Sequence, residues 1–293
     1  MTIYDNPIIH IICGPTSSGK TGYALKQIGD KEAIIITVDS RHLYQGLSIT
    51  TGWDLDLTKN NIKYFGFGYF RPDQIANAVD YTKYVHQIID ENIGKKEIYL
   101  VGGSGFYLQS IIHPEIIDSV QSNPELRKRL EKMSVEELKT ELKKTSPEIF
   151  SSLNNSDQNN PRRLIRRLEI ISQPLVPSVS PCHRVAFPHP YQIICLPTPK
   201  NHQELINKRI EKRLSDGCLD EVKKLLSNYP DQSLPIYTAI GVKQMILFIN
   251  GKISHEEMFN LWLIDELNYV KRQLTWFKKH LPPVISSEVD GSI

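Results

Sequence analysis

The sequence predicts an α/β fold in which helices cover both faces of a parallel sheet. Short apolar runs occupy residues 8–13, 33–38 and 97–101, and none of them alternates with polar residues as a half-exposed strand would. Segments with helical periodicity separate these runs. Continuous apolar strands joined by helices are typical of parallel sheets that are buried on both sides.

The other elements follow from periodicity in chain order. A first helix is expected from Gly19 and a second from Pro72 to about Ile93, because a first helical turn tolerates proline. Residues 123–153 are helical and charged, and the polar stretch 151–160 without periodicity predicts a mobile edge. The rest predicts a helix over 161–172, a strand over 191–196 and further helices to the end.

The longest helix is expected over about 254–280. Its apolar stripe consists of Leu263, Leu267, Val270, Leu274 and Phe277. We therefore expect two parts. Residues 1–114 and 161–293 form an α/β core with C-terminal helices, and residues 115–160 form a small helical insertion.

The composition is that of a soluble globular protein, since 40% of the 293 residues are hydrophobic and 23% are charged. It excludes disordered and fibrous proteins. No run approaches the roughly 18 apolar residues of a membrane helix, so we expect a cytoplasmic protein without a membrane partner. The four cysteines, Cys13, Cys182, Cys195 and Cys218, lie far apart in the sequence and predict neither a zinc site nor a disulfide framework.

The charges are distributed unevenly. Residues 1–120 hold 10 Lys+Arg against 13 Asp+Glu, whereas residues 121–293 hold 25 against 20. The first part is thus net negative and the second net positive. This split is consistent with an anionic partner bound by the second part or with a solvated basic surface.

The clearest motif is GPTSSGKT, which fits G-x-x-x-x-G-K-[ST] after a predicted strand and at the start of a predicted helix. Backbone N–H groups and a helix N-terminus can cradle a polyphosphate there, Lys20 adds a cation, and Thr21 offers a hydroxyl to Mg²⁺. The motif predicts a P-loop-like fold and a loop that binds diphosphate or nucleotide. The predicted binding residues are Gly14, Pro15, Thr16, Ser17, Ser18, Gly19, Lys20 and Thr21.

Two further strand ends carry candidate residues. Asp39 ends the second apolar run, where it can act as a metal ligand, as a general base or as a cap for the residues that follow. The segment VGGSGFYL at 101–108 has Ser104 where an ATPase usually places an acid, which disfavours ATP hydrolysis. Its two glycines indicate that a group approaches the backbone closely, or that strand and helix pack at a tight turn.

A third cluster is basic. Arg162, Arg163, Arg166 and Arg167 lie on adjacent faces of one predicted helix. Guanidinium groups suit phosphate oxygens and can stack on bases. A solvated face paired with Glu169 is an equally good interpretation from these residues alone.

In this order and at these separations, the four stretches resemble the tRNA dimethylallyltransferase (tRNA isopentenyltransferase) family. GPTSSGKT is similar to its phosphate loop, VDSRHLYQGLSITTG to its D-S-x-x-x-Y-x-G-[ML]-x-I-x-T segment, and VGGSGFYLQ to its G-G-T-G-L-Y segment. Further similar blocks are NPELR, NPRRLIRRLE, DGCLDEV, IGVKQ and VKRQLTWFKK, so that the resemblance spans about residues 8–280. Without a C-terminal zinc finger, the chain resembles the bacterial form.

The resemblance implies transfer of the dimethylallyl group of dimethylallyl diphosphate to the exocyclic amine of the tRNA adenosine just 3′ of the anticodon. Asp39 would accept a proton from the amine, Thr16 would position amine and diphosphate, and Lys20 with Mg²⁺ on Thr21 would stabilise the leaving diphosphate. The target base must leave its stack. The residues implied in tRNA binding are Asp39, Ser40, Arg41, His42, Ser104, Arg127, Arg162, Arg163, Leu164, Ile165, Arg166, Lys243, Lys271, Arg272 and Gln273.

The chain departs from the family pattern at several places. Ser104 replaces a threonine, Val242 an aromatic residue, and Gly52-Trp53-Asp54 a Lys-Pro, and residues 66–72 replace a His-rich acidic stretch. Three alternatives to tRNA prenyl transfer are a prenyltransferase on free adenine nucleotide, a P-loop kinase for a small metabolite and a non-catalytic RNA-binding protein. Arg127, Arg162 to Arg166 and the helical insertion disfavour the first, because a free nucleotide would not need them. The basic second half disfavours the kinase, and the intact phosphate loop with Asp39 disfavours the RNA-binding protein. We expect a monomer.

Overall fold

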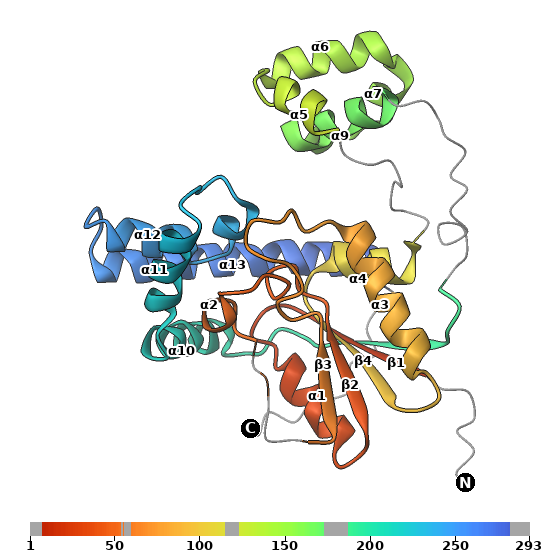
Figure 1. Cartoon of the computed structure of the whole chain (residues 1–293), viewed down its shortest axis with the longest axis vertical. Coiled ribbons are helices and arrows are strands. Elements are labelled where there is room, and N and C mark those ends of the chain that lie inside the picture. Colours follow the sequence, from red (N-terminus) through yellow and green to blue (C-terminus); the bar gives the residue numbers. More distant parts are fainter. Residues whose placement is uncertain (1–7, 54, 56–59, 115–122, 173–186, 282–293) are drawn as a thin grey trace. The chain divides into compact units, whose positions relative to one another are not determined.

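The computed structural model describes residues 8–53, 55, 60–114, 123–172 and 187–281. The chain divides into two compact units (Figure 1). The first unit comprises Met1–His113 and Phe187–Ile293, and the second comprises Pro114–Ala186. Each unit has its own hydrophobic core and is described by itself.

A five-stranded parallel sheet forms the centre of the first unit. Its strands, in the order β3-β2-β4-β1-β5, are β3 (Ile62–Phe65), β2 (Ala33–Thr37), β4 (Glu97–Gly102), β1 (Ile9–Cys13) and β5 (Tyr191–Cys195). All neighbouring pairs are parallel. The four expected strands are confirmed, whereas the four-residue edge strand β3 was not predicted, because its mixed sequence IKYF lies in a stretch without clear periodicity. The carboxyl ends of β2, β4 and β1 are adjacent, so the segments that follow them share one edge of the sheet.

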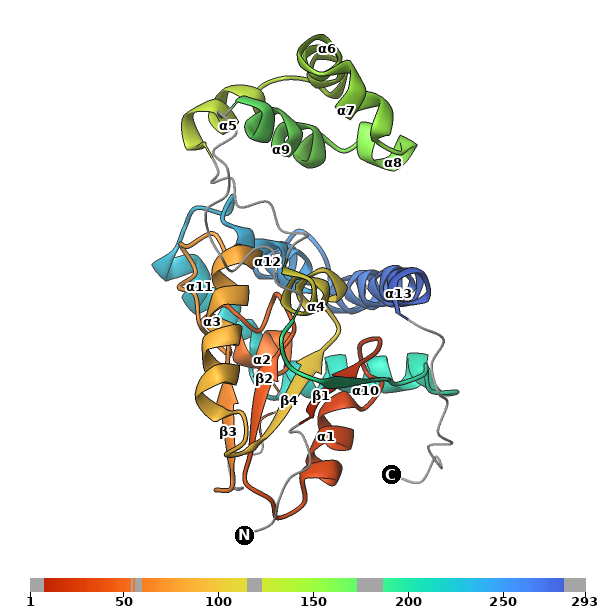
Figure 2. The ribbon, with the colours of Figure 1, turned by 90° about the vertical axis from the view of Figure 1, so that its right-hand side faces the viewer.

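Apolar side chains cover both faces of this sheet, which explains why its strands do not alternate. On one face, Ile11, Ile36 and Leu100 belong to the main core, which α3 (Ala78–Asn92) and α4 (Gly105–Ile112) help to build. On the other face, Ile12 and Val101 pack with α1 (Lys20–Ile28). Figure 2 shows α1 and α3 on opposite sides of the strands.

The remaining helices of the first unit follow the sheet in sequence, apart from the short α2. They are α2 (Ser48–Thr51), α10 (His202–Ser215), α11 (Cys218–Asn228), the 3₁₀ turn η3 (Pro235–Thr238), α12 (Val242–Ile249) and α13 (His255–His280). The helix expected from Pro72 begins only at Ala78. The side chain of Asn77 accepts a hydrogen bond from Asp80 N and thereby caps the helix at that point.

The long helix α13 begins where the sequence predicts, because Ser254 and Glu257 form a capping box. Its buried face differs from the expected stripe. Leu274 is 39% exposed, and polar Glu266 and Gln273 are buried instead. Both polar side chains have hydrogen-bond partners in other elements, which apolar periodicity cannot reveal.

The described residues of the second unit form a cluster of five helices. These are α5 (Pro124–Leu130), α6 (Val135–Thr145), α7 (Pro147–Ser152), α8 (Asn155–Gln158) and α9 (Pro161–Ser172). The expected boundary at residue 160 is wrong, because Leu164, Ile165 and Leu168 of α9 pack into the core of this unit with Leu138 and Leu142. The stretch 151–160 also contains α8, capped by Asn154, rather than only irregular chain. Residues 115–122 of the expected insertion lie outside the described residues.

Two observations complete the fold. Among the helices that the structure describes, none has the length and apolarity needed to span a membrane. Cys13 and Cys195, far apart in sequence, are register partners on β1 and β5, and both are free thiols. Cys182 lies outside the described residues.

Candidate active site

The GPTSSGKT segment forms the turn between β1 and α1, as the sequence predicts. The turn spans the residues between Cys13 and Lys20, and Lys20 is the first residue of the helix. The Lys20 ammonium donates to the carbonyl of Pro15 at 2.6 Å, which folds the lysine back over the loop. The hydroxyl oxygens of Ser17 and Ser18 are buried and have no hydrogen-bond partner among the described residues. Buried hydroxyl donors next to a lysine and a helix N-terminus form a suitable binding site for an anion.

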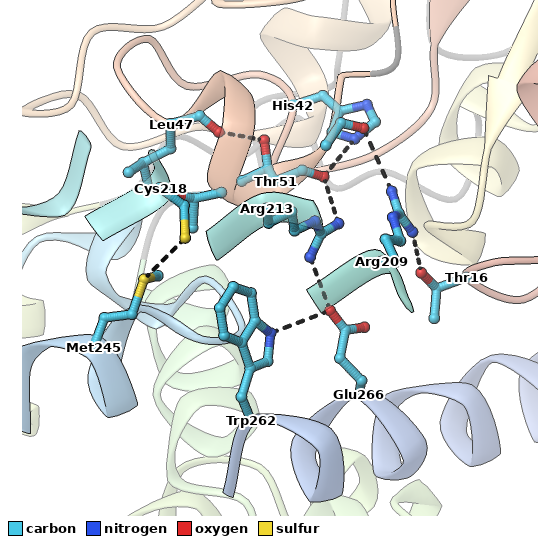
Figure 3. Close-up of polar contacts among 12 residues, drawn as sticks. Thr16, His42, Leu47, Thr51, Arg209, Arg213, Cys218, Met245, Trp262 and Glu266 are labelled. Carbon is cyan, nitrogen blue, oxygen red and sulfur yellow. Dashed lines mark hydrogen bonds and ion pairs between the residues drawn. The ribbon is translucent and has the colours of Figure 1, made fainter. Parts of the chain in front are cut away.

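Thr16 at the centre of this loop is 9% exposed, and side chains of the C-terminal helices hold all three of its polar groups. Its backbone N–H donates to Gln273 Oε1 at 2.9 Å, and its carbonyl accepts from His202 Nε2 at 2.7 Å. Its hydroxyl accepts from Arg209 Nη1 at 2.6 Å, a contact drawn in Figure 3. Residues from α10 and α13 therefore fix the position of the loop.

The sequence prediction named Gln273 as a tRNA contact, whereas its side chain is buried and its amide binds Thr16 and Gly103. His202 and Arg209 were missed. Both residues lie on α10, whose sequence HQELINKRIEKRLS has the mixed charges of an ordinary solvated helix. Their partner Thr16 lies 186 and 193 residues away in the chain. No local pattern in the sequence indicates that pairing.

Asp39 lies in the turn after β2 and is partly exposed. Its Oδ1 accepts from the backbone N–H of Arg41 at 2.9 Å, and the next residue, Ser40, donates its N–H to Ser104 Oγ at 3.0 Å. The N–H of Ser104 in turn donates to the Val38 carbonyl at 3.0 Å. The turns after β2 and β4 are thus joined on both sides of Asp39, which holds its backbone in place.

The glycines after β4 are explained by protein packing. A Cβ added at Gly102 would lie 2.1 Å from the Val38 carbonyl oxygen, so only glycine fits there. Gln273 Nε2 donates to the Gly103 carbonyl at 3.0 Å. The close approach expected at these glycines is therefore confirmed, and the approaching groups are the β2 turn and Gln273. Through its single amide, Gln273 joins the phosphate loop to the β4 turn.

Two tyrosines lie in the electrostatic neighbourhood of Asp39. Burial raises the pKa of Tyr107 to about 12, and the nearby Tyr44 and Asp39 contribute in the same direction. Burial, followed by the charge of Asp39, also raises the pKa of Tyr269, whose phenol is hydrogen-bonded to Ser104. Both phenols stay neutral at physiological pH and add no negative charge beside the carboxylate. The sequence prediction missed both tyrosines.

Other residues implied in tRNA binding from the first unit have protein partners or lie on the surface. His42 Nδ1 pairs with Thr37 Oγ1 at 2.9 Å, and its Nε2 donates to the Thr51 carbonyl at 3.2 Å, so the imidazole is part of the scaffold. Arg41 Nη1 donates to the Pro235 carbonyl at 3.2 Å. Lys243, Lys271 and Arg272 are exposed, with Arg272 above the Tyr269 ring. Their contacts with RNA stay predictions.

In the second unit, the buried Glu169 gathers two of the predicted arginines. Its Oε2 lies 2.6 Å from Arg127 Nη2 and 3.6 Å from Arg166 Nη1. Arg163 is paired with Asp157, and Arg162 is exposed.

Leu164 and Ile165 are only 0% and 6% exposed and form part of the helical core. Their predicted contact with RNA is therefore wrong for their side chains, which face inward because apolar positions of α9 build that core.

A resident metal site built by the protein alone is not found in the part of the chain that the structure describes. No group of three His, Cys, Asp or Glu side chains there could hold an ion. Thr21 stands in the first turn of α1, directly after Lys20. This donor set fits Mg²⁺ only if substrate phosphates and water supply most of its ligands, which is the usual arrangement for Mg²⁺.

Comparisons with known proteins agree with this geometry. A family model described as IPP transferase matches residues 42–280. The tRNA dimethylallyltransferase of Halothermothrix orenii is 30% identical over 284 residues, which cover 94% of this chain and 86% of that protein. A tRNA dimethylallyltransferase 2 of Bacteroides fragilis is 32% identical over 286 residues, which cover 95% of this chain and 90% of that protein.

Solved structures are similar as well. The full-length tRNA isopentenylpyrophosphate transferase from Bacillus halodurans has a TM-score of 0.64 at 25% identity and covers 94% of this chain and 88% of its own. A eukaryotic dimethylallyltransferase acting on tRNA shares the fold, with a TM-score of 0.75 at 19% identity over 93% of this chain and 70% of its own. Since the family model and the relatives each cover most of the sequence, the chain belongs to the IPP transferase family.

Proposed function

We propose that this transferase moves the dimethylallyl group from dimethylallyl diphosphate to the exocyclic amine of the adenosine 3′-adjacent to the anticodon in tRNA, with release of diphosphate. The names of its relatives support the reaction class. The observation that carries the proposal is the contact between Arg209 and Thr16 in the phosphate loop, at the sheet edge where Asp39 also lies. This places a cation and a carboxylate at one end of the sheet.

The phosphate loop would bind the diphosphate. The N-terminus of α1, Lys20 and the hydroxyls of Ser17 and Ser18 supply positive charge and donors. Arg209, held on the Thr16 hydroxyl, adds a second cation. As the C–O bond of the donor breaks, negative charge grows on the leaving diphosphate, and these groups stabilise it. When bound, Mg²⁺ on Thr21 would neutralise part of the same charge.

Asp39 would act as the general base for the acceptor, the adenosine amine. The lone pair of an adenine amine is delocalised into the ring, so the amine is a poor nucleophile until a base takes its proton. We assign the proton to the Asp39 carboxylate as the new C–N bond forms. The hydrogen bonds from Arg41 N and between Ser40 and Ser104 keep this carboxylate oriented. The phenols of Tyr107 and Tyr269 are neutral, so they do not repel the negative charge of the Asp39 carboxylate.

The second unit would bind the tRNA. Its arginines on α5 and α9 present guanidinium groups that suit RNA phosphates, and these contacts position the substrate without reading its sequence. The target base must be extruded from the anticodon loop to reach the carboxylate. We further propose that the enzyme works as a monomer in the cytoplasm, where its tRNA substrate is found.

The test is a direct assay of product. The protein is incubated with Mg²⁺, dimethylallyl diphosphate and unmodified tRNA that reads codons beginning with U, and the nucleosides are analysed by mass spectrometry. We expect isopentenyladenosine from this tRNA and none from a matched transcript with guanosine at the target position. Absence of the product, together with ATP turnover on small hydroxyl metabolites, would instead identify a kinase.

A further inference from the structure

A buried ionic network centred on Arg213 lies behind the phosphate loop, and the proposed chemistry uses none of its members except Arg209. The short helix α2 ends at Thr51, whose carbonyl accepts two hydrogen bonds. Arg213 Nη2 lies 3.1 Å from this oxygen and His42 Nε2 lies 3.2 Å from it (Figure 3). One peptide carbonyl is therefore shared between α10 and the turn that carries Asp39.

The guanidinium of Arg213 is itself fixed by α13. Its Nη1 donates to Glu266 Oε1 at 3.0 Å, and the indole N–H of Trp262 donates to the same oxygen at 3.4 Å. The arginine and glutamate side chains are only 8% and 6% exposed. A buried pair of this kind adds little net stability compared with apolar packing. The pair instead fixes the orientation of the Arg213 guanidinium, because this planar group must donate to Glu266 and to the Thr51 carbonyl at the same time.

The neighbouring Gly52 brings the second arginine into the network. A Cβ at this residue would lie 2.7 Å from Arg209 Nη2 and 2.8 Å from Arg213 Nη2, and its φ of +69° favours glycine. Arg209 Nη2 is 3.4 Å from the Gly52 carbonyl, while its Nη1 holds the Thr16 hydroxyl. The Thr51-Gly52 peptide therefore supports both arginines of α10.

The opposite end of α2 is held just as firmly. The carboxylate of Glu221 on α11 accepts four hydrogen bonds, each 2.8 or 2.9 Å long. The donors are Ser48 Oγ, Ile49 N, Thr50 N and Thr50 Oγ1. Charged side chains therefore hold both ends of α2.

We propose that Arg213 is a positioning residue that aligns the two halves of the active site through Thr51 and Gly52. On one side, Thr51 holds His42, whose backbone N–H donates to the Asp39 carbonyl at 3.1 Å. On the other side, Gly52 supports Arg209 on the phosphate loop. Arg213, oriented by Glu266 and Trp262, sets the separation between the proton acceptor and the diphosphate. This inference rests on the proposed transfer reaction.

The test compares Arg213→Lys and Glu266→Gln with Val85→Ala, a stability control on α3 whose side chain is 0% exposed and lies outside the network. A lysine can reach only one of the two acceptors, so we expect Arg213→Lys to lower kcat at least tenfold with the KM for tRNA within twofold. A misplacement of about 1 Å can cost a hundredfold in rate. Glu266→Gln should behave similarly, whereas Val85→Ala should lower Tm and leave kcat at 25 °C unchanged.

A second measurement separates positioning from general destabilisation. Because part of the effect of Arg213 passes through Arg209, Arg213→Lys should lower kcat by a smaller factor in an Arg209→Lys background than in the wild-type protein. Full additivity, or an unchanged kcat in Arg213→Lys, overturns the inference. Should Arg213→Lys fail to fold, Trp262→Phe replaces it, because this change removes only one donor to Glu266. A few-fold lower kcat in Trp262→Phe supports the inference, and an unchanged kcat overturns it. A wild-type protein that makes no isopentenyladenosine would instead disprove the proposed function.

Discussion

Two buried glutamates each bind arginine in this chain, one in each unit, and their arginines differ in exposure. In the first unit, Glu266 holds Arg213, whose side chain is 8% exposed. In the second unit, Glu169 is 0% exposed, but the side chains of Arg127 and Arg166 are 32% and 30% exposed. The acid is equally buried in both places. Only the second arrangement leaves positive charge at the protein surface.

This difference separates two roles of arginine. A fully buried guanidinium can act only through its protein partners, so Arg213 orients backbone and side chains of the active site. A guanidinium that is about one third exposed, as in Arg127 and Arg166, keeps part of its charge in contact with solvent, where a phosphate can approach. We therefore expect changes in the first unit to affect the rate of transfer and changes in the second unit to affect the affinity for tRNA.

The largest expected effect is that of Asp39→Ala. Loss of a general base typically costs 100- to 10,000-fold in rate, so transfer should fall to about background. The affinity for tRNA, measured by filter binding, should stay within a few-fold because loss of a carboxylate removes no cationic contact with the phosphates. Transfer that persists in this variant would exclude Asp39 as the proton acceptor.

A change at Glu169 tests the independence of the second unit. Glu169→Gln leaves Arg127 without its anion, and removal of one partner from a buried pair costs up to about 3–5 kcal/mol, less here because Arg127 is partly solvated. All three tryptophans, Trp53, Trp262 and Trp276, lie in the first unit. Circular dichroism should therefore detect helix loss at a lower urea concentration than tryptophan fluorescence does. Coincident transitions would mean that the two units unfold together.

Arg163→Ala is expected to have a smaller effect, on binding alone. Loss of one phosphate contact should weaken tRNA binding and make the plot of log affinity against log salt shallower by somewhat less than one unit. Lys95→Ala, an exposed cation of the first unit, is the matched control and should leave the slope unchanged. An unchanged slope in Arg163→Ala would show that its partner is Asp157 and not RNA.

The smallest effect concerns alkaline pH and should be confined to the first unit, which contains all 13 tyrosines. Because the folded pKa of Tyr107 is raised to about 12, the unfolded chain loses this proton first as pH rises above about 10. The contribution of Tyr107 to the free energy of unfolding should therefore be constant below pH 9 and fall between pH 10 and 12. In Tyr107→Phe the fall should be shallower by a fraction of the roughly 1.4 kcal/mol per pH unit that one proton represents. Urea titrations at several pH values measure this.

The sequence was sufficient for the elements that depend on local pattern. The phosphate loop, four of the five strands and the start of α13 at its capping box follow from residues close together in the chain. The end of the insertion does not, because α9 is amphipathic and its partner could have been either unit. Only the packing of Leu164 and Leu168 against α6 decides this.

The site was predicted less completely, for a physical reason. Arg209, Arg213 and His202 have the sequence context of a solvated helix, and Glu266 and Gln273 interrupt an apolar stripe. Arg209 is partly buried and the other four are buried, because a polar partner distant in the chain compensates the loss of water. The periodicity of apolar residues in a sequence indicates only which apolar side chains are buried. Polar residues that are buried with a distant partner are therefore predicted to lie on the surface.

The contact between Thr16 and Gln273 has a consequence for biosynthesis. The central N–H of the phosphate loop finds its acceptor 257 residues later in the chain, which at ordinary elongation rates is a delay of about 10–50 s. Until α13 docks, the nascent loop lacks that fixed geometry. The phosphate loop therefore reaches its final geometry only after α13, synthesised much later than the loop, has docked.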